Sequence, residues 1–382
     1  MRPIKPPVWV PDVIPSTIPL PLEALFCFVT ALVFSLYGTP VAARAAVRFG
    51  IVDMPDGTLK THRGPVPYLG GLAVYVSFVL TMALVFDFDQ RVLGLLLAGT
   101  ILVLLGLIDD FGVLGVWPKF LGQGFATLVL IKSDIAIHIG SMPDWANLAL
   151  TVIWIVGATN AFNIIDIMDG LASGIALIAA AFLLVVAFLN GHEPIALMTA
   201  TLMGSLLGFL RYNAHPARIF MGDTGSLFIG MMLGALAMIG QYDRYNNIGY
   251  LSPLLILAVP IFDTVYVMTL RLLRKRNPFK GSPDHFALRL RRLGMPVRAV
   301  VGLSWGLAAA LGCLAIFNLF LAEGMSLVLI AGVGVFLFMF GAALSRVPDA
   351  QPRAGVPSAP DEAALDPAVR QAHENLLMWR RR

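Results

Sequence analysis

The sequence has few charged residues and few cysteines. Of its 382 residues, 13% are charged and 58% are hydrophobic, and the mean hydropathy is +0.81. Soluble globular proteins carry about 25% charged residues, and their core helices contain apolar runs of roughly 10–14 residues, shorter than the repeated runs of about 20 found here. The composition therefore excludes an ordinary soluble domain. The two cysteines, Cys27 and Cys313, lie in apolar runs and imply no disulfide framework.

Two further features are missing. The first 21 residues contain seven prolines but no cationic stretch that leads into an apolar run, so we do not expect a cleavable signal peptide. No internal repeat is visible, and we interpret residues 1–346 as one polytopic membrane domain. Residues 347–382 then form a cytoplasmic Pro/Ala-rich linker and a basic tail. Apolar residues before the terminal arginines indicate a short amphipathic helix on anionic membrane lipid, with a solvated tail as the alternative.

Long apolar runs are abundant. A spanning helix needs about 20 residues, and two of the runs are short enough to need flanking turns. The sequence predicts an all-α polytopic membrane protein with about eleven transmembrane helices, ten being the alternative number. The runs fall at residues 22–43, 69–86, 92–108, 119–133, 146–160, 170–190, 194–211, 225–240, 250–270, 299–320 and 325–345.

Lysine and arginine are distributed unevenly between the two sides. With the N-terminus outside and the C-terminus in the cytoplasm, 22 of the 27 Lys and Arg residues fall on the inner side, as the positive-inside rule requires. The outer side keeps Arg2, Lys5, Arg91, Lys132 and Arg244. The same threading places Asp109-Asp110, residues 160–169, Asp223, Lys60, Lys119 and the segment 271–298 on the inner face. We therefore predict one site on the cytoplasmic face of a bacterial inner membrane.

Carboxylates gather where apolar runs end. Asp109-Asp110 follows the run that ends at residue 108, and Asp223 lies in the turn that begins at Phe220. An ionised Asp in lipid costs roughly 3 kcal/mol or more, and adjacent carboxylates repel each other unless a cation lies beside them. Magnesium suits this place because it takes oxygen ligands and keeps waters for substrate phosphates. A solvated acidic pair at a helix end and simple N-capping by Asp223 are the alternatives.

A second polar group follows the run at 146–160. Asn160, Asn163, Asp166 and Asp169 are spaced by three residues and end at Gly170. On a helix each step of three turns about 300°, so Asn163, Asp166 and Asp169 would share an arc of about 120°. This geometry favours side chains that converge on a ligand over a random polar loop.

The segment 271–298 is strongly basic. Plain positive-inside charge explains part of this, while arginine is suited to gripping phosphate. We select His285 and Arg289 as candidates, with His62 as a weaker one. Asp263 is ionisable within an apolar run, which indicates either a functional residue or a helix-packing hydrogen bond.

These segments together resemble the polyprenyl-phosphate N-acetylhexosamine-1-phosphate transferases. The resemblance implies a helical membrane fold with a cytoplasmic groove, and transfer of a sugar-1-phosphate from a UDP-sugar to undecaprenyl phosphate with release of UMP. It also implies magnesium as cofactor, with manganese as an alternative. The matching segments are Asp53-Met-Pro55, 60–71, 108–111, 160–174, 220–230, 260–263, Asp284-His285 and Arg289-Leu290.

The resemblance also implies roles for particular residues. Asp109, Asp110 and Asp223 correspond to the essential acids, and Asp110, Asp166 and Asp223 would hold the metal. The expected substrate-binding residues are Lys60, Lys119, Asn160, Asn163, Asp166, Asp169, Phe220, His285 and Arg289. The expected partners are the UDP-sugar, the polyprenyl phosphate and anionic membrane lipid; a homodimer is left open and no nucleic acid is expected.

Three departures from the family pattern concern the donor sugar. Some members carry a third Asp where this chain has Val113, the usual Asp-Gly-Leu-Asp-Gly reads Asp166-Ile-Met-Asp169-Gly170, and the basic loop holds His285 as its single histidine. Fewer polar side chains leave fewer means of recognising a lactyl-peptide substituent. We therefore expect UDP-N-acetylglucosamine or a related UDP-N-acetylhexosamine, with UDP-muramoyl-pentapeptide as the alternative.

Two other classes of membrane protein fit the sequence less well. A secondary transporter places ionisable groups near the bilayer midplane and shows paired halves, whereas these acids lie at the ends of runs and no repeat is visible. A phosphotransferase that uses CDP-alcohols would need an Arg shortly after Asp169-Gly170, and the sequence there is Leu-Ala-Ser-Gly.

Overall fold

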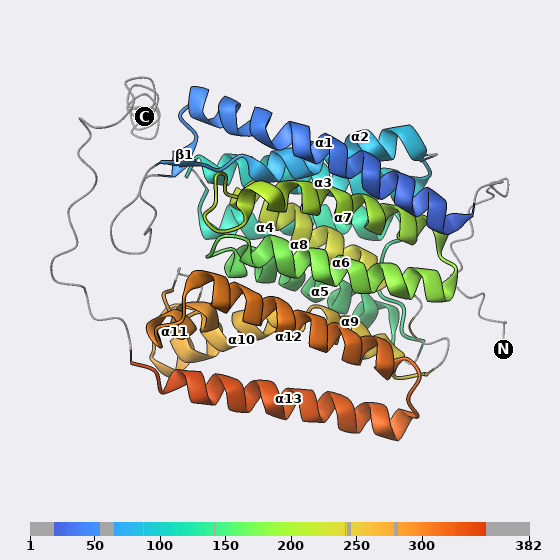
Figure 1. Ribbon diagram of the computed structural model, residues 1–382. Coiled ribbons are helices and arrows are strands. Elements are labelled where there is room, and N and C mark those ends of the chain that lie inside the picture. Colours follow the sequence, from blue (N-terminus) through green and yellow to red (C-terminus); the bar gives the residue numbers. More distant parts are fainter. Residues whose placement is uncertain are drawn as a thin grey trace.

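The computed structural model describes residues 19–348 apart from 54–64, 87, 113, 141, 241, 243–245 and 279–281. It is a layered bundle of long helices, with α1 at one edge and α13 at the other (Figure 1). The elements are α1 Leu20–Arg48, β1 Val52–Asp53, β2 Val66–Pro67, α2 Gly70–Val85, α3 Gln90–Asp110, α4 Val116–Lys132, α5 Asp144–Ile165, α6 Leu171–Asn190, α7 Glu193–Asn213, α8 Gly222–Ile239, η1 Gly249–Leu251, α9 Ser252–Ile256, α10 Ala258–Leu273, α11 Phe286–Arg292, α12 Val297–Asn318 and α13 Glu323–Ser345.

Ten of the eleven predicted apolar runs each lie in one helix, to within a residue or two at the ends of the run, and the run at 250–270 is divided between helices. Among the described residues, eight helices are long and apolar enough to cross a membrane, and the bent pair formed by η1–α9 and α10 would make a ninth. The helix α2 is apolar but shorter, and α4 has 17 residues. The all-α polytopic class is confirmed, while the number eleven and the sidedness stay predictions. The tail at 349–382, Lys60 and His62 lie outside the described residues.

The ninth predicted span is not one helix, so this part of the prediction was wrong. The helices on either side of Leu257 are bent by 70° relative to each other. Pro260 lies in the first turn of α10, and its ring would clash with the carbonyl of residue 256 in a continuous helix. A break before the proline removes that clash.

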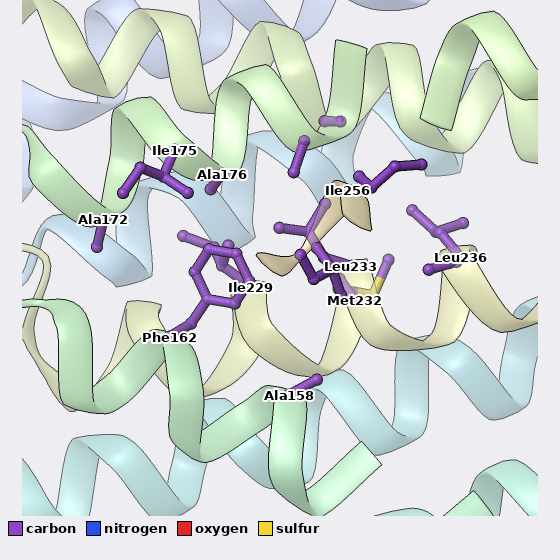
Figure 2. Close-up of a cluster of buried hydrophobic side chains, with 14 of the residues drawn as sticks. Ala158, Phe162, Ala172, Ile175, Ala176, Ile229, Met232, Leu233, Leu236 and Ile256 are labelled. Atoms are coloured by element: carbon purple, nitrogen blue, oxygen red, sulfur yellow. The ribbon is translucent and has the colours of Figure 1, made fainter. Parts of the chain in front are cut away.

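Helices α7 and α8 are the most buried of the long apolar helices. In their most apolar windows 83% and 78% of the residues are buried, against 11% in α13. Figure 2 shows α8 side chains packed between Ala158 and Phe162 of α5 and Ala172 and Ile175 of α6. A Cβ added to Gly230 would lie 2.7 Å from the carbonyl oxygen of Ala158, so the small residue allows the close approach of α5 and α8.

A short hairpin fixes the approach to α8. The strands β1 and β2 pair antiparallel, with Val52 opposite Pro67. The Phe220 N–H donates to the carbonyl of Pro67 at 2.8 Å, and the Gly70 N–H donates to the carbonyl of Phe220 at 3.0 Å. The turn that carries Asp223 is therefore attached to both β2 and the start of α2.

Candidate active site

An acidic cluster forms where three helices meet. Asp109 lies in the last turn of α3 and Asp223 in the first turn of α8. Lys119 of α4 places its ammonium between the two carboxylates and forms an ion pair with each. The three side chains are 13–31% exposed, so solvent screens these ion pairs only partly. Three predicted site residues from distant parts of the chain thus lie in direct contact.

Asp110 has a different set of partners from its neighbour Asp109. Its Oδ1 accepts the Asp223 N–H at 2.7 Å, and its Oδ2 accepts the N–H and the hydroxyl of Thr224 at 3.1 and 2.6 Å. A carboxylate on the first N–H groups of a helix is stabilised by the helix dipole. Gly222 has φ +71°, and a Cβ there would lie 2.7 Å from Oδ2 of Asp110. Asp110 therefore orients the start of α8, and with it Asp223.

Asn163 extends the cluster from α5. Its amide donates to Oδ1 of Asp223 at 2.8 Å and to the Ser226 hydroxyl at 2.9 Å. Helix α5 ends at Ile165, so Asp166 and Asp169 lie in a turn, and the predicted shared helical arc was wrong for these two residues. The turn closes at Gly170, which has φ +73°, a conformation that glycine adopts at little cost.

Asp166 is the most perturbed carboxyl in this turn. Burial, and then the negative charges of Asp223, Asp110 and Asp169, raise the pKa of its carboxyl to about 8. This group favours its protonated form at neutral pH unless a cation is supplied. Such a carboxyl beside other acids is typical of a site that a ligand completes.

Asp169 brings a histidine to the site that sequence reasoning left out. Its Oδ2 lies 2.7 Å from Nδ1 of His215 and accepts the Ala217 N–H at 3.0 Å. Nearby, the Asn213 side chain accepts the Gly170 N–H at 3.1 Å and donates to the carbonyl of Ile219 at 3.0 Å. The loop before α8 is thus bound to the turn after α5. The position of His215 a few residues before Asp223 was the available signal.

Asn160 has a partner that the sequence did not indicate. Its amide donates to Oε1 of Gln123 at 2.6 Å and to the carbonyl of Val156 at 2.8 Å, and Gln123 donates back at 3.3 Å. Gln123 lies one helical turn after Lys119 on α4. The structure therefore gives Asn160 the role of joining α5 to α4, and its predicted contact with substrate gains no support.

Arg289 is likewise engaged by the protein itself. It is fully buried. It donates to Oδ1 of Asp284 at 2.7 Å and to the carbonyls of Leu344 and Val347 at 3.2 and 2.8 Å. These carbonyls lie at the end of α13, where a cation is stabilised by the helix dipole. Arg289 joins α11 to α13, which is a different role from the phosphate contact that we predicted.

The remaining predicted residues are placed as follows. His285 immediately precedes α11 and contacts Asp263 of α10. The backbone of Phe220 holds the turn before Asp223 through the contacts described above, and Lys60 lies outside the described residues.

Divalent cations suit the oxygen atoms of this cluster. In the described part of the chain no group of three or more His, Cys, Asp or Glu side chains is already arranged around a common point. Magnesium does not need such a cage, because it binds through one or two carboxylates plus waters and substrate phosphates. Among the described residues, the cluster contains more carboxylates than cations. The described ion pairs bring it Lys119 and, when protonated, His215, whereas its carboxylates are those of Asp109, Asp110, Asp166, Asp169 and Asp223. Their charge and ligand chemistry fit magnesium.

The chain is similar to known proteins over the segments that form this site. The profile of glycosyl transferase family 4 matches residues 92–241. The probable undecaprenyl-phosphate N-acetylglucosaminyl 1-phosphate transferase of Bacillus subtilis is 34% identical over 289 residues, 73% of this chain and 80% of the relative. The decaprenyl-phosphate N-acetylglucosaminephosphotransferase of Mycolicibacterium smegmatis is 33% identical over 310 residues, 71% and 76% of the two chains.

A third relative bears on the alternative donor. The phospho-N-acetylmuramoyl-pentapeptide-transferase of Caldicellulosiruptor bescii is 32% identical over 287 residues, 68% of this chain and 85% of the relative. The matched profile runs from α3 to the end of α8 and contains the whole acidic cluster from Asp109 to Asp223. With about a third of the residues identical over most of both chains, this protein belongs to glycosyl transferase family 4.

Proposed function

We propose that this protein transfers N-acetylglucosamine-1-phosphate from UDP-N-acetylglucosamine to undecaprenyl phosphate and releases UMP. The observation that carries the proposal is the contact of Asp109, Lys119 and Asp223 at one end of a helical membrane protein of this family. Both substrates are anionic, so a site that joins them must screen their repulsion. An ammonium between carboxylates, together with a divalent cation that those carboxylates would bind, supplies that screening.

The chemistry needs little proton transfer. A phosphate monoester has a second pKa of about 6, so the acceptor is mostly a dianion at pH 7. Its oxygen forms a bond to the sugar-bearing phosphorus of the donor while the bond to the UMP oxygen breaks. Lys119 neutralises charge beside the diphosphate, and Asp110 keeps Asp223 in place by holding the start of α8.

The metal enters through the same side chains. Of the three ligands expected from the sequence, Asp223 and Asp166 would hold it, because both lie in the cluster and Asp166 has the raised pKa of a carboxyl short of cations. Asp110 is the third expected ligand, and both of its oxygens already accept hydrogen bonds from the start of α8. When bound, magnesium neutralises phosphate charge and stabilises the leaving UMP. Asn163 fixes one oxygen of Asp223 and leaves the carboxylate oriented for that role.

The donor proposal rests on side-chain chemistry and on the relatives. The basic segment offers His285 where a larger set of polar groups would be needed to recognise a peptide-bearing sugar. The Bacillus and Mycolicibacterium relatives carry N-acetylglucosamine in their names. The similarity of the muramoyl relative keeps UDP-muramoyl-pentapeptide as the second candidate.

One assay tests the reaction and the donor. Purified protein, undecaprenyl phosphate and magnesium are combined with each UDP-sugar in turn, and UMP and the lipid-linked product are measured. We expect turnover with UDP-N-acetylglucosamine, its loss in EDTA and its return with added magnesium. Turnover with the muramoyl-pentapeptide donor alone would overturn the donor assignment, and full activity in EDTA would eliminate the metal.

The site is proposed to face the cytoplasm of a bacterial inner membrane. The support is the excess of Lys and Arg on the predicted inner side. A reporter fused after Arg346 should be active only as a cytoplasmic reporter. Activity of an extracytoplasmic reporter at that position would show that the number of spans has the wrong parity.

A further inference from the structure

A buried carboxylate on α10 holds the residue that begins the short helix α11. Asp263 is fully buried, and the side chain of His285 is 7% exposed. Oδ2 of Asp263 lies 2.7 Å from Nδ1 of His285, and Oδ1 accepts the Phe286 N–H at 3.0 Å. Both oxygens of one carboxylate therefore bind consecutive residues. An ionised group this deep is retained only where such partners compensate its lost hydration.

The contact determines which ring nitrogen is available. A carboxylate accepts hydrogen bonds, so in the neutral imidazole the proton lies on Nδ1, and Nε2 carries the lone pair. Within the described residues no hydrogen-bond partner of Nε2 is seen, and Nε2 is not among the buried polar atoms that lack one. In its neutral form, His285 therefore presents a hydrogen-bond acceptor at Nε2.

Helix α11, which His285 immediately precedes, is attached to neighbouring helices at two points. Arg289, one turn into α11, is fixed to Asp284 and to the end of α13. The N-terminal end is fixed to α10 by Asp263, and α10 packs against α5, the helix that ends beside Asp166. Figure 1 shows α11 at the same end of the bundle as β1, whose partner strand β2 holds the turn before Asp223. His285 thus lies at the same end of the bundle as the acidic cluster.

We propose that Asp263 is a positioning residue: it sets the tautomer of His285 so that Nε2 accepts a hydrogen bond from a hydroxyl or the acetamido N–H of the donor sugar. The inference rests on the proposed transferase function. It separates His285 from the groups that bind phosphate, because a lone pair repels a phosphate oxygen. The ligand contact is with the sugar, so Asp263 acts on recognition of the donor through His285.

Asp263→Asn gives a sharp test because its amide can take only one orientation. The oxygen must remain on Oδ1 to accept the Phe286 N–H, so the NH₂ faces Nδ1 of His285. Nδ1 then has to accept, and the proton moves to Nε2. The variant keeps the volume of the side chain and the start of α11, but it switches the tautomer of His285, so that Nε2 presents an N–H to the sugar.

The experiment is a double-mutant cycle in steady-state turnover. We expect Asp263→Asn to raise the KM for the UDP-sugar about tenfold, the size expected for one opposed hydrogen bond, with the KM for undecaprenyl phosphate unchanged. His285→Asn keeps a donor for Oδ2 and removes Nε2, and it should raise the same KM. Adding Asp263→Asn to His285→Asn should change it no further. Thr264→Val, which removes a neighbouring hydroxyl bonded to the Pro260 carbonyl, is the matched control.

Each other outcome contradicts the proposal. Equal losses from Asp263→Asn with and without His285 would show a purely structural carboxylate. A lower KM in Asp263→Asn would show that Nε2 meets a phosphate oxygen. If Asp263→Asn does not fold, a normal donor KM in His285→Asn overturns the proposal alone. The cycle uses whichever UDP-sugar the wild type turns over, so a wrong donor is distinguished, and a wild type that turns over none rejects the transferase function itself.

Discussion

The acidic cluster and the basic segment contain the same kinds of charged side chain but differ in how they are paired. Around Asp109, Asp166 and Asp223, carboxylates outnumber the cations of the described ion pairs, and burial raises the pKa of Asp166. Around Asp284, two arginines bind one carboxylate, and Arg289 also donates to backbone carbonyls. The first region carries more negative charge than the cations of its described ion pairs compensate, whereas the carboxylate of Asp284 is compensated by arginines of the protein itself.

This contrast distinguishes charged residues that serve the proposed reaction from those that hold the helices together. Charge that the fold leaves uncompensated costs stability, and a site tolerates that cost where a substrate or metal compensates it later. Charge that is fully paired holds helices together. Changes in the acidic cluster should therefore reduce turnover at constant stability, while changes around Asp284 should reduce stability first.

The largest effect is expected for Asp223→Asn. The substitution keeps the size of the side chain but removes the charge that Lys119 and the proposed metal share. We expect kcat to fall about 1,000-fold, or about 4 kcal/mol of barrier, measured as UMP release. The unfolding temperature in detergent should stay near that of the wild type. A variant that unfolds early and retains its specific activity would reverse the comparison between the regions.

Arg289→Met should act in the opposite way. It removes a fully buried guanidinium and leaves the carbonyls at the end of α13 without their donor. Breaking a buried pair on one side costs about 3 kcal/mol, which thermal or denaturant unfolding would register. Arg289→Lys, which keeps the charge but loses the forked geometry, should recover part of the stability. An unchanged stability together with a loss of phosphate binding would restore the substrate role for Arg289.

Asp284 gives the pairing a pH signature. Burial opposes ionisation, but hydrogen bonds from Ser282 and Arg289, with the charges of Arg274 and Arg289, hold its pKa below the usual range. Because the pKa of Asp284 is lower in the folded state, its ionisation stabilises the protein at pH values above the unfolded-state pKa of about 3.9. This stabilisation is lost as the pH falls through the folded-state pKa. The gap in unfolding temperature between wild type and Asp284→Asn should be constant above about pH 5 and close below about pH 4. A gap that widens in acid would contradict this sign.

The smallest effect is expected at the contact between α4 and α5. Gln123→Leu removes the two hydrogen bonds between Gln123 and Asn160, while Asn160 keeps its bond to the carbonyl of Val156; the loss should cost about 1 kcal/mol. Lys119 lies one turn away on α4, so a few-fold loss of turnover should accompany the loss of stability. Asn160→Leu, which removes the other partner, should give a similar loss, and the two together less than the sum. Loss of turnover at unchanged stability in Asn160→Leu would instead indicate a substrate contact.

Sequence reasoning reached the family and the fold class because both are expressed in local patterns. Apolar runs of about 20 residues predict spanning helices whatever surrounds them, and the comparisons confirm the family. It failed at Asp166 and Asp169, where a helical spacing was extended past the end of α5. It also failed at Leu257, where the clash at Pro260 outweighs the continuous apolar run.

The sequence by itself determined that this is a membrane protein, the sign of the charge in its two charged regions and the family to which it belongs. Only the tertiary structure decided which charges meet. Lys119 reaches Asp223 across 104 positions of the chain, Asp169 holds His215, and Asp263 holds His285. A side chain carries its charge in the sequence, but its partner is selected by how helices pack, and packing depends on contacts between residues that are distant in the chain. For this reason Arg289 and Asn160 resembled ligand-binding groups in the sequence and join helices in the fold.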